Sequence, residues 1–426
     1  MSTITHKTRH YWKGPKINTE RLMQDIYTLS QIGKNDQDKG IYRMGFSKAD
    51  FEGRFWLMEQ IRQAGYQAEM DGAGNVFGKV KEPYSGPAVL TGSHLDTVPC
   101  GGALDGALGV LAALECLRVI REEGIQTKYP VELVAFSDEE GRFGGMIGSQ
   151  ALAGDLTPES IEKSMDTEGV ILADVLRERG LDAMTVLGAW RDPATIQAYL
   201  ELHIEQGRVL ESLNKEIGIV EGIVGLFKWQ IRLIGAANHE GTTPMNLRND
   251  AFLALADFAH EIPRILDENG TEISRATIGK VELQPGFAHT IPGQVEFTLV
   301  VRDNSREILD ELAIAFRKTL SAIARRSSLM FEFEELNYSE PSLNDPGMSQ
   351  LIEKVAKKMN FEHYSMFSGA GHDAQVMSRI TRTGMIFVPS KEGISHSPAE
   401  WTDAHHLEIG ANLLLNTLLE VAGIQS

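Results

Sequence analysis

The sequence has little cysteine, no long apolar run and no excess of basic charge. Cys100 and Cys116 are the two cysteines among 426 residues, which argues against a disulfide framework and fits a reducing compartment. No apolar stretch approaches the roughly 20 residues that span a bilayer. The N-terminal stretch is polar and basic and lacks the apolar core of a secretory signal. We therefore expect a cytoplasmic protein.

Acidic residues dominate the charge. The 59 Asp and Glu outnumber the 41 Lys and Arg, which gives a formal net charge of −18. A chain this acidic is a poor partner for nucleic acid or an anionic membrane, so we expect neither. A small anionic substrate is still compatible, because a local pocket can have the opposite sign. The length predicts two domains, since it exceeds what one ordinary core accommodates.

A strand–helix–strand pattern opens the first half of the chain. An apolar run at 88–91 predicts a strand, and 104–124 follows with apolar residues at helical spacing and Gly124 suited to its end. A second apolar run, 131–136, predicts another strand. Units of this kind build parallel sheets, so the predicted fold class is α/β with a mostly parallel central sheet.

Side chains able to bind metal follow four predicted strands. In open α/β sheets, ligands bind beyond the carboxyl ends of the strands. The stretches concerned are "GSHLDTVPCGGALDGALGV" with His94, Asp96 and Asp105; "SDEEGRFGG" with Asp138, Glu139 and Glu140; "LELHIEQG" with His203 and Gln206; and "GISHSPAEWT" with His396.

Imidazole and carboxylate are the ligands of zinc and similar divalent ions in hydrolytic sites. Two neighbouring ions need a bridging ligand, and a carboxylate can bridge because it has two oxygens. We therefore predict Asp105 as the bridge. The predicted terminal ligands are His94, Glu140, His203 and His396.

Two acids remain beside this predicted site. Asp96 lies two residues after His94 and is placed to accept the other ring N–H of that histidine. Glu139 neighbours a predicted ligand and stays free, as expected of a general base that later protonates the leaving amine.

Each motif alone also has an ordinary interpretation. A single histidine or an acidic loop is more often structural than functional, and "GGALDG" lacks the G-x-G-x-x-G spacing of a dinucleotide site. The combination of H-x-D, a following D-G, an E-E pair and two distant histidine loops is much rarer. A plain α/β protein with incidental acids is therefore disfavoured.

These motifs, together with "NHEGTTPM" and "FSGAGHDAQ", run in order from Gly92 to Thr402. The chain resembles the amidase/carbamoylase branch of the dinuclear zinc peptidase family, which contains N-carbamoyl-L-amino acid hydrolases, allantoate amidohydrolases and β-ureidopropionases. The resemblance implies two divalent ions per subunit, zinc or else manganese, cobalt or nickel. It also implies hydrolysis of a linear amide or ureido C–N bond in a small carboxylate-bearing substrate, by a water that the ions activate and Glu139 deprotonates.

The resemblance also assigns the ligands. One ion would bind His94, Asp105 and His203, and the other would bind Asp105, Glu140 and His396. Glu139 matches the family's general base, and Asp96 matches the carboxylate that supports the site.

A two-domain architecture is implied as well. Residues 1–221 and 337–426 would form the catalytic domain, and 222–336 an inserted lid that makes a homodimer. Within the insert, the sequence predicts strands at 228–233, 296–303 and 329–336 and helices at 249–266 and 307–326, which suits an open α/β sandwich.

Residues that contact the substrate are carried over in the same way. His239 matches a histidine donated across the dimer to polarise the scissile carbonyl, and Gln206 a residue near the ureido or amide group. Arg302 matches an arginine that pairs with the substrate carboxylate. Gly371 and His372 match a loop that lines the same pocket.

One departure concerns His289. The family usually has an asparagine before "IPG" that helps to hold the substrate carboxylate, and this chain has His289 there. Imidazole is larger than the amide and can donate from either ring nitrogen. We therefore expect an altered carboxylate pocket.

Two other functions stay open. The first is hydrolysis of an N-acyl amino acid, as in aminoacylases and dipeptidases, although related peptidases usually offer a carboxylate at the position of His203. The second is a non-catalytic dimeric binding protein, which the loss of a ligand or of Glu139 would favour. None of these residues is missing.

Overall fold

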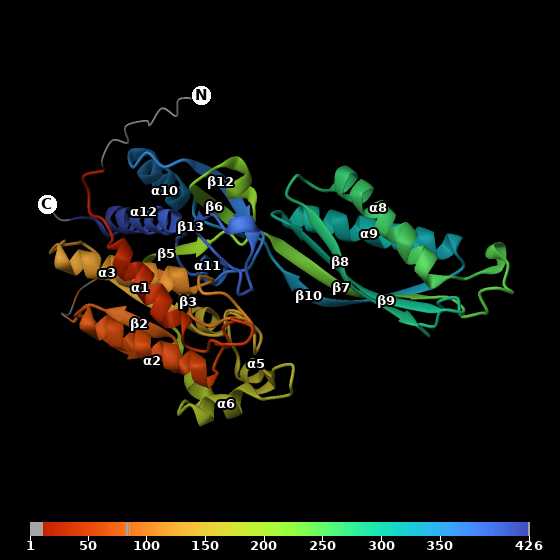
Figure 1. The fold of residues 1–426 in the computed structure, drawn as a ribbon, viewed down its shortest axis with the longest axis horizontal. Helices are drawn as coiled ribbons and strands as arrows, with labels where there is room; N and C mark the ends of the chain where they lie inside the picture. Colours follow the sequence, from red (N-terminus) through yellow and green to blue (C-terminus); the bar gives the residue numbers. More distant parts are fainter. Residues whose placement is uncertain (1–11, 82–83, 85, 425–426) are drawn as a thin grey trace. The chain divides into compact units, whose positions relative to one another are not determined.

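The computed structural model describes residues 12–81, 84 and 86–424, which form two compact units (Figure 1). The first unit comprises 1–221 and 343–426, and the second comprises 222–342. The chain returns to the first unit after Ser342 instead of Leu336, because strand β10 (Met330–Ser339) continues past Leu336.

The first unit is built on a sheet of nine strands in the order β1-β2-β4-β3-β5-β13-β6-β11, with β12 beside β6. Its strands are β1 (Gln67–Met70), β2 (Val76–Lys79), β3 (Ala88–His94), β4 (Val131–Phe136), β5 (Ile196–Ile204), β6 (Ile217–Ile223), β11 (Ser342–Leu343), β12 (His363–Ser368) and β13 (Thr383–Val388). The central strands β4, β3, β5 and β13 are parallel, and β1, β2 and β6 pair antiparallel. The predicted α/β fold with a mostly parallel sheet is confirmed.

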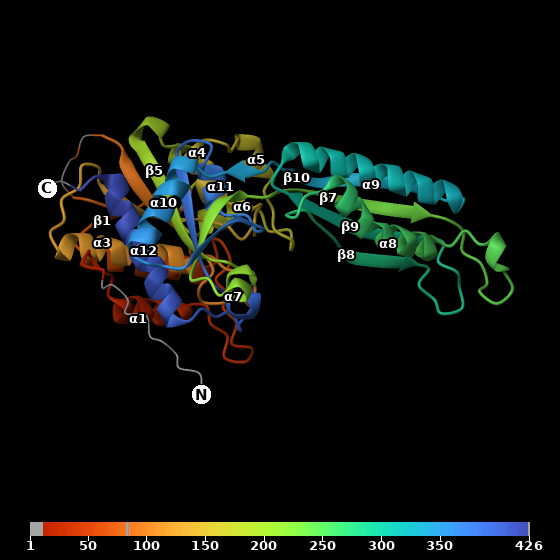
Figure 2. The same cartoon turned by 90° about the horizontal axis from the view of Figure 1, so that it is seen from above.

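Helices and 3₁₀ turns complete the first unit. They are α1 (Thr19–Ser30), α2 (Lys48–Gln63), α3 (Ala107–Glu122), α4 (Ile147–Ala153), α5 (Pro158–Lys163), α6 (Leu172–Glu178), α7 (Val209–Leu213), α10 (Pro346–Lys358), α11 (Asp373–Met377), α12 (Ala404–Ala422) and the 3₁₀ turns η1 (Ala183–Ala189), η2 (Pro193–Thr195) and η4 (Lys391–Gly393). Figures 1 and 2 show α3 and α12 side by side, and both contact the central strands. The main core lies between these helices and the sheet, since β3 and β4 are buried along their whole length.

The second unit is a four-stranded antiparallel sheet in the order β10-β7-β9-β8, with two long helices on one face (Figure 2). Its elements are β7 (Gly225–Ile234), η3 (Met245–Leu247), α8 (Ala251–Asn269), β8 (Arg275–Gln284), β9 (Gln294–Asp303), α9 (Arg306–Arg326) and β10. Burial alternates along β7 and β9, so every second side chain packs against α8 and α9. The strands β7, β9 and β10 and the helices α8 and α9 agree with the ranges expected from the sequence, whereas the sequence predicts no range for β8.

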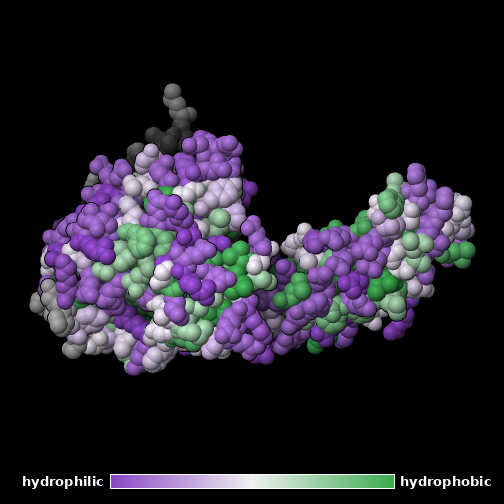
Figure 3. Space-filling model, turned by 90° about the horizontal axis from the view of Figure 1, so that it is seen from below, coloured by the Kyte–Doolittle hydropathy of each residue, from purple (hydrophilic) through white to green (hydrophobic). Residues whose placement is uncertain are grey.

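Among the described helices, none has the length and apolar character needed to cross a membrane. Hydrophilic residues cover most of the face seen in Figure 3, interrupted by smaller hydrophobic areas.

Candidate metal centre

Four neighbouring parallel strands bring the predicted ligands to one edge of the sheet. His94 ends β3, Glu140 follows β4, His203 lies one residue before the end of β5, and His396 follows β13. Because these strands are adjacent and parallel, their carboxyl ends meet at the same edge. His94 and His203 are each 1% exposed, whereas the His396 side chain is about half exposed, at 47%.

Asp105 lies at the centre of the cluster, in the loop before α3. Its Oδ1 is 3.2 Å from His203 Nε2 and 3.9 Å from His94 Nε2. Its Oδ2 is 3.2 Å from His396 Nε2, and that nitrogen is 3.4 Å from Glu140 Oε2. Two groups of potential ligand atoms result, His94–Asp105–His203 and Asp105–Glu140–His396, and within each group all atoms lie within 4.8 Å of one another.

Backbone carbonyls orient two of the histidine rings. His94 Nδ1 is 3.1 Å from the carbonyl oxygen of Asp96, and His203 Nδ1 is 2.9 Å from that of Ile204. A carbonyl only accepts, so each ring carries a hydrogen on Nδ1 and turns Nε2 toward Asp105. The amide of Gly106 also donates to His203 Nε2, at 3.1 Å. This is the state in which a neutral imidazole binds a metal ion.

Gly106 is required by the same geometry. It begins α3 with a φ of +63°, and a Cβ on this residue would lie 2.4 Å from the ring of His94. Only glycine therefore lets the backbone pass this close to the ligand.

Asp96 has a different role from the expected one. Its Oδ1 is 3.8 Å from His94 Nδ1, and the ring bonds to the backbone carbonyl instead. The buried carboxylate accepts the backbone amides of Glu139 at 3.3 Å and Glu140 at 3.1 Å. Asp96 therefore fixes the loop that carries the two acids, because the turn after β4 brings their amides closer than the ring.

The electrostatics of the cluster favour bound cations. In the described part of the chain, the ion pairs of Asp105, Glu139 and Glu140 are all with imidazoles. Burial, and then the charge of Asp105, raises the pKa of Glu140 to about 8. Glu140 Oε1 is buried and has no hydrogen-bond partner. Burial lowers the pKa of His94 to about 4, which keeps this ring neutral. These donors fit two divalent ions.

Glu139 belongs to neither ligand group. Its Oε2 is 3.6 Å from His94 Nε2. Burial raises its pKa well above the ordinary value of glutamate, and the neighbouring charges of Asp373 and Glu140 add to this effect. The carboxylate therefore has a strong tendency to accept a proton.

Gln206 contacts the predicted bridge. Its side-chain amide donates to Asp105 Oδ2 at 2.8 Å, and its backbone amide donates to Ser390 Oγ at 3.0 Å. The sequence predicts Gln206 near the substrate, and the structure places it against Asp105, within the cluster of potential ligands.

A further layer of polar groups lies behind the ligands, and the sequence analysis missed its centre, Glu201. This buried carboxylate accepts Ser93 Oγ at 2.6 Å, Tyr199 Oη at 3.1 Å and the amide of Ala374 at 3.0 Å. With His203 and His372 it forms a third group of potential ligand atoms. A single acid inside a strand gives no sequence signal of this kind.

His372 and Gly371 lie in the loop before α11. The ring of His372 is 1% exposed and packs edge-on against His203, with centroids 4.5 Å apart. Its Nε2 is 2.8 Å from Ser368 Oγ. His372 therefore supports the ligand histidine from the side. Gly371, expected beside the substrate, lies next to it in the chain.

The remaining predicted residues belong to the second unit. His239 pairs with Thr290, just before β9 begins, and His289 Nδ1 lies 3.2 Å from Glu240. Arg302 lies near the other end of β9, opposite Leu226. Arg302 comes eight positions after Gln294, which corresponds to about 26 Å along a strand. Within one chain, His239 and Arg302 are therefore at opposite ends of the sheet.

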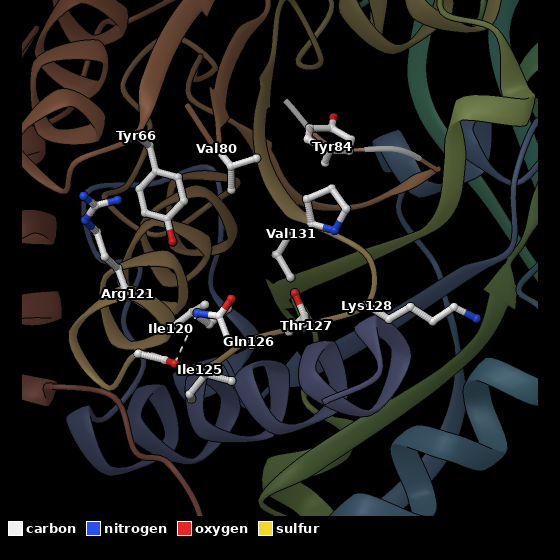
Figure 4. A pocket seen from close by; sticks show the side chains of 12 residues that line it. Tyr66, Val80, Tyr84, Ile120, Arg121, Ile125, Gln126, Thr127, Lys128 and Val131 are labelled. Atoms are coloured by element: carbon white, nitrogen blue, oxygen red, sulfur yellow. Dashed lines mark hydrogen bonds between the residues drawn. The ribbon is translucent and has the colours of Figure 1, made fainter. Parts of the chain in front are cut away.

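Another pocket, of about 480 Å³, lies elsewhere in the first unit. Its lining includes Tyr66, Arg121, Gln126 and Lys128. Figure 4 shows Tyr66 and Arg121 on one side, with the amine of Lys128 pointing away from them. None of the predicted site residues lines it, so it is separate from the metal centre.

Comparisons with known proteins agree with this site. Residues 90–420 match the model of peptidase family M20/M25/M40. The chain is 39% identical to an N-carbamoyl-L-amino acid amidohydrolase of Geobacillus stearothermophilus over 95% of this chain and 99% of that protein. It is 34% identical to an allantoate amidohydrolase of Bacillus subtilis, with 96% and 99% covered. A hydantoinase/carbamoylase family amidase from Burkholderia multivorans superposes with a TM-score of 0.88 at 32% identity, over 96% and 98% of the two chains. The chain therefore belongs to peptidase family M20/M25/M40, as one of its amidohydrolases acting on non-peptide C–N bonds.

Proposed function

We propose that this protein is a metal-dependent amidohydrolase that removes the carbamoyl group of a small, carboxylate-bearing ureido compound. The observation that carries the proposal is Asp105, whose two oxygens face different histidines, as a carboxylate shared by two ions requires. Two of the relatives are named for N-carbamoyl-L-amino acids and for allantoate, which are both ureido acids.

His94, Asp105 and His203 would hold one ion, and Asp105, Glu140 and His396 the other. Zinc, manganese, cobalt and nickel all suit this donor set. When bound, the two ions supply Lewis acidity and lower the pKa of water.

Glu139 acts as the general base. It lies beside the ligand cluster without belonging to either group, and its raised pKa favours taking a proton from the attacking water. The same carboxyl group then protonates the leaving amine. The carboxylate of Asp96 keeps the backbone of Glu139 in place, because it accepts a hydrogen bond from the backbone amide of Glu139.

A second copy of the chain completes the site. Arg302 pairs with the substrate carboxylate, and His239 donates to the scissile carbonyl. These two side chains lie at opposite ends of the sheet of one chain, so a small substrate meets both only when another copy supplies one of them. The functional unit is therefore a homodimer with shared sites.

A hydrolysis screen tests the proposal. Full-length protein, loaded with zinc or manganese and compared with chelator-treated protein, is offered N-carbamoyl-L-amino acids, allantoate, other ureido acids and N-acetyl-L-amino acids. We expect metal-dependent hydrolysis of at least one ureido acid. Hydrolysis confined to N-acetyl compounds would make the protein an aminoacylase. Ligand binding without turnover would make it a binding protein.

A further inference from the structure

Glu240 lies between two histidines at one end of the second unit. Its Oε1 is 3.2 Å from His289 Nδ1, and its Oε2 is 3.3 Å from His239 Nδ1. The two loops that carry these side chains are tied together, because the amide of Ile291 donates to the carbonyl of Asn238 at 2.8 Å. The carboxylate therefore lies against both rings, but only its Oε1 has a hydrogen-bond partner on a ring, which is His289.

The guanidinium of Arg248 braces this loop from within. It donates to the backbone carbonyls of Glu240 and Thr243, and the amide of Thr243 donates to the carbonyl of His239 at 3.2 Å. The backbone of 239–243 is thus fixed by its own hydrogen bonds, which leaves the side chain of Glu240 free to orient the ring of His289.

The ring of His239 carries its hydrogen on Nε2. The backbone amide of Gly241 donates to His239 Nδ1 at 3.0 Å. An amide N–H only donates, so Nδ1 of the neutral ring must be the accepting nitrogen. His239 therefore presents an N–H donor at Nε2.

His289 has the opposite arrangement. Its Nδ1 faces Glu240 Oε1, and an ionised carboxylate only accepts, so the hydrogen is on Nδ1. Although burial acts in the other direction, hydrogen bonds from its own backbone amide and from His289 hold the pKa of Glu240 below its ordinary value. The neutral ring of His289 therefore presents a lone pair at Nε2.

We propose that Glu240 is a positioning residue that sets the tautomer of His289 opposite to the one that the Gly241 amide sets on His239, and that the resulting donor–acceptor pair of imidazoles selects a carbamoyl group over an acyl group. The carbamoyl carbonyl accepts from His239 Nε2, and its terminal NH₂ donates to His289 Nε2. An N-acyl compound has a methyl group in place of this NH₂ and leaves His289 Nε2 without a partner. A carboxylate offers two acceptors and would face the lone pair of His289.

This inference rests on the proposed function for its substrate, whereas the tautomers can be measured without turnover. The first test is nitrogen NMR of the zinc-loaded, full-length protein with ¹⁵N-labelled histidine, at about pH 8, above the ordinary imidazole pKa of about 6.5. His239→Asn and His289→Asn variants assign the signals. We expect the hydrogen on Nε2 of His239 and on Nδ1 of His289.

Variants at Glu240 distinguish an effect on the His289 tautomer from a general effect on the fold. In Glu240→Ala, the Nδ1–H of His289 loses its acceptor, and we expect the hydrogen to shift toward Nε2. Glu240→Gln keeps an accepting oxygen and should retain the wild-type tautomer. Glu282→Ala is the control, since this exposed acid pairs with Lys280 at 2.7 Å elsewhere in the unit. A His289 hydrogen on Nε2 in the wild type, or no change in Glu240→Ala, would overturn the proposal.

The second test measures binding without hydrolysis. Calorimetry with the Glu139→Gln protein gives the Kd of N-carbamoyl-L-methionine and of N-acetyl-L-methionine. The two compounds differ in one group, which is NH₂ in the first and CH₃ in the second. We expect the carbamoyl compound to bind more tightly, and the ratio to fall about tenfold or more when Glu240→Ala is added but not when Glu240→Gln or Glu282→Ala is added. An unchanged ratio in Glu240→Ala would overturn the selectivity. If neither compound binds, N-carbamoyl amino acids are excluded as the substrate class, and the NMR result still decides the tautomers.

Discussion

The side-chain amide of Gln206 donates to Asp105 at 2.8 Å, and it does so at Oδ2, the oxygen that also faces His396. An ion held by Asp105, Glu140 and His396 would need this same oxygen. We therefore expect the amide to compete with such an ion for this oxygen.

Removal of the competing amide should strengthen metal binding. In Gln206→Ala we expect the more weakly bound ion to bind about two- to tenfold more tightly, the range that corresponds to one ordinary hydrogen bond. Competition with a coloured chelator measures this. Gln63→Ala, on the exposed end of α2, is the matched control. Weaker binding in Gln206→Ala would show that Gln206 is itself a ligand.

Glu139→Gln should retain both ions and lose turnover. The amide keeps the shape of the side chain but cannot take a proton from water, so kcat should fall by about 10²- to 10⁴-fold. Steady-state kinetics measures the loss of kcat, and elemental analysis of the same sample checks that both ions are retained. Near-normal kcat in a protein that keeps its metal would require another group to activate the water.

Metal binding should release protons. The hydrogen bond between His396 and Asp105 raises the pKa of His396 to about 9, whereas burial of the ring lowers it. Below that pH the metal-free ring is protonated, and a proton must leave before the ring binds an ion, so affinity should rise as the pH increases toward 9. Calorimetry at pH 7.5 in buffers of different ionisation enthalpy counts these protons. His396→Ala should release fewer, and equal release would exclude this ring as their source.

Mixed dimers test the shared site. Glu139→Gln and His239→Ala should each be nearly inactive. In His239→Ala we expect kcat to fall by about 10²- to 10³-fold. If His239 acts across the dimer, a hybrid has one site with both lesions and one site with neither, so activity returns on subunit exchange. Exchange is verified with differently tagged chains. No recovery despite exchange would place His239 in its own chain's site or outside catalysis.

The sequence predicts the ligand cluster because strand ends can be recognised locally. The run 131–136 is β4 to the residue, and His94, Glu140 and His203 follow from the rule that parallel strands end at one edge. The alternation of apolar and polar residues at 228–233 likewise predicts β7, because helices bury one face of this strand.

Other features depend on distances that a sequence does not contain. The bond of His94 to the carbonyl of Asp96 instead of its carboxylate is decided by the path of the backbone after β3. The contact of Gln206 with Asp105 joins residues 101 positions apart. The segment that carries α4, α5 and α6 packs as a separate apolar cluster under short helices, whose weak periodicity gave no prediction.

The order of the ligands along the chain has a consequence for synthesis. His94, Asp105 and His203 are all translated before the second unit begins at Gly222, whereas His396 comes after the whole of it. Domains fold as units, with N-terminal parts available first. The growing chain thus possesses every residue of one potential ligand group long before it completes the other. A polypeptide that stops short of β13 has three of the four strands that precede predicted ligands and a single complete ligand group, so under the proposed function only chains that extend past His396 could bind two ions.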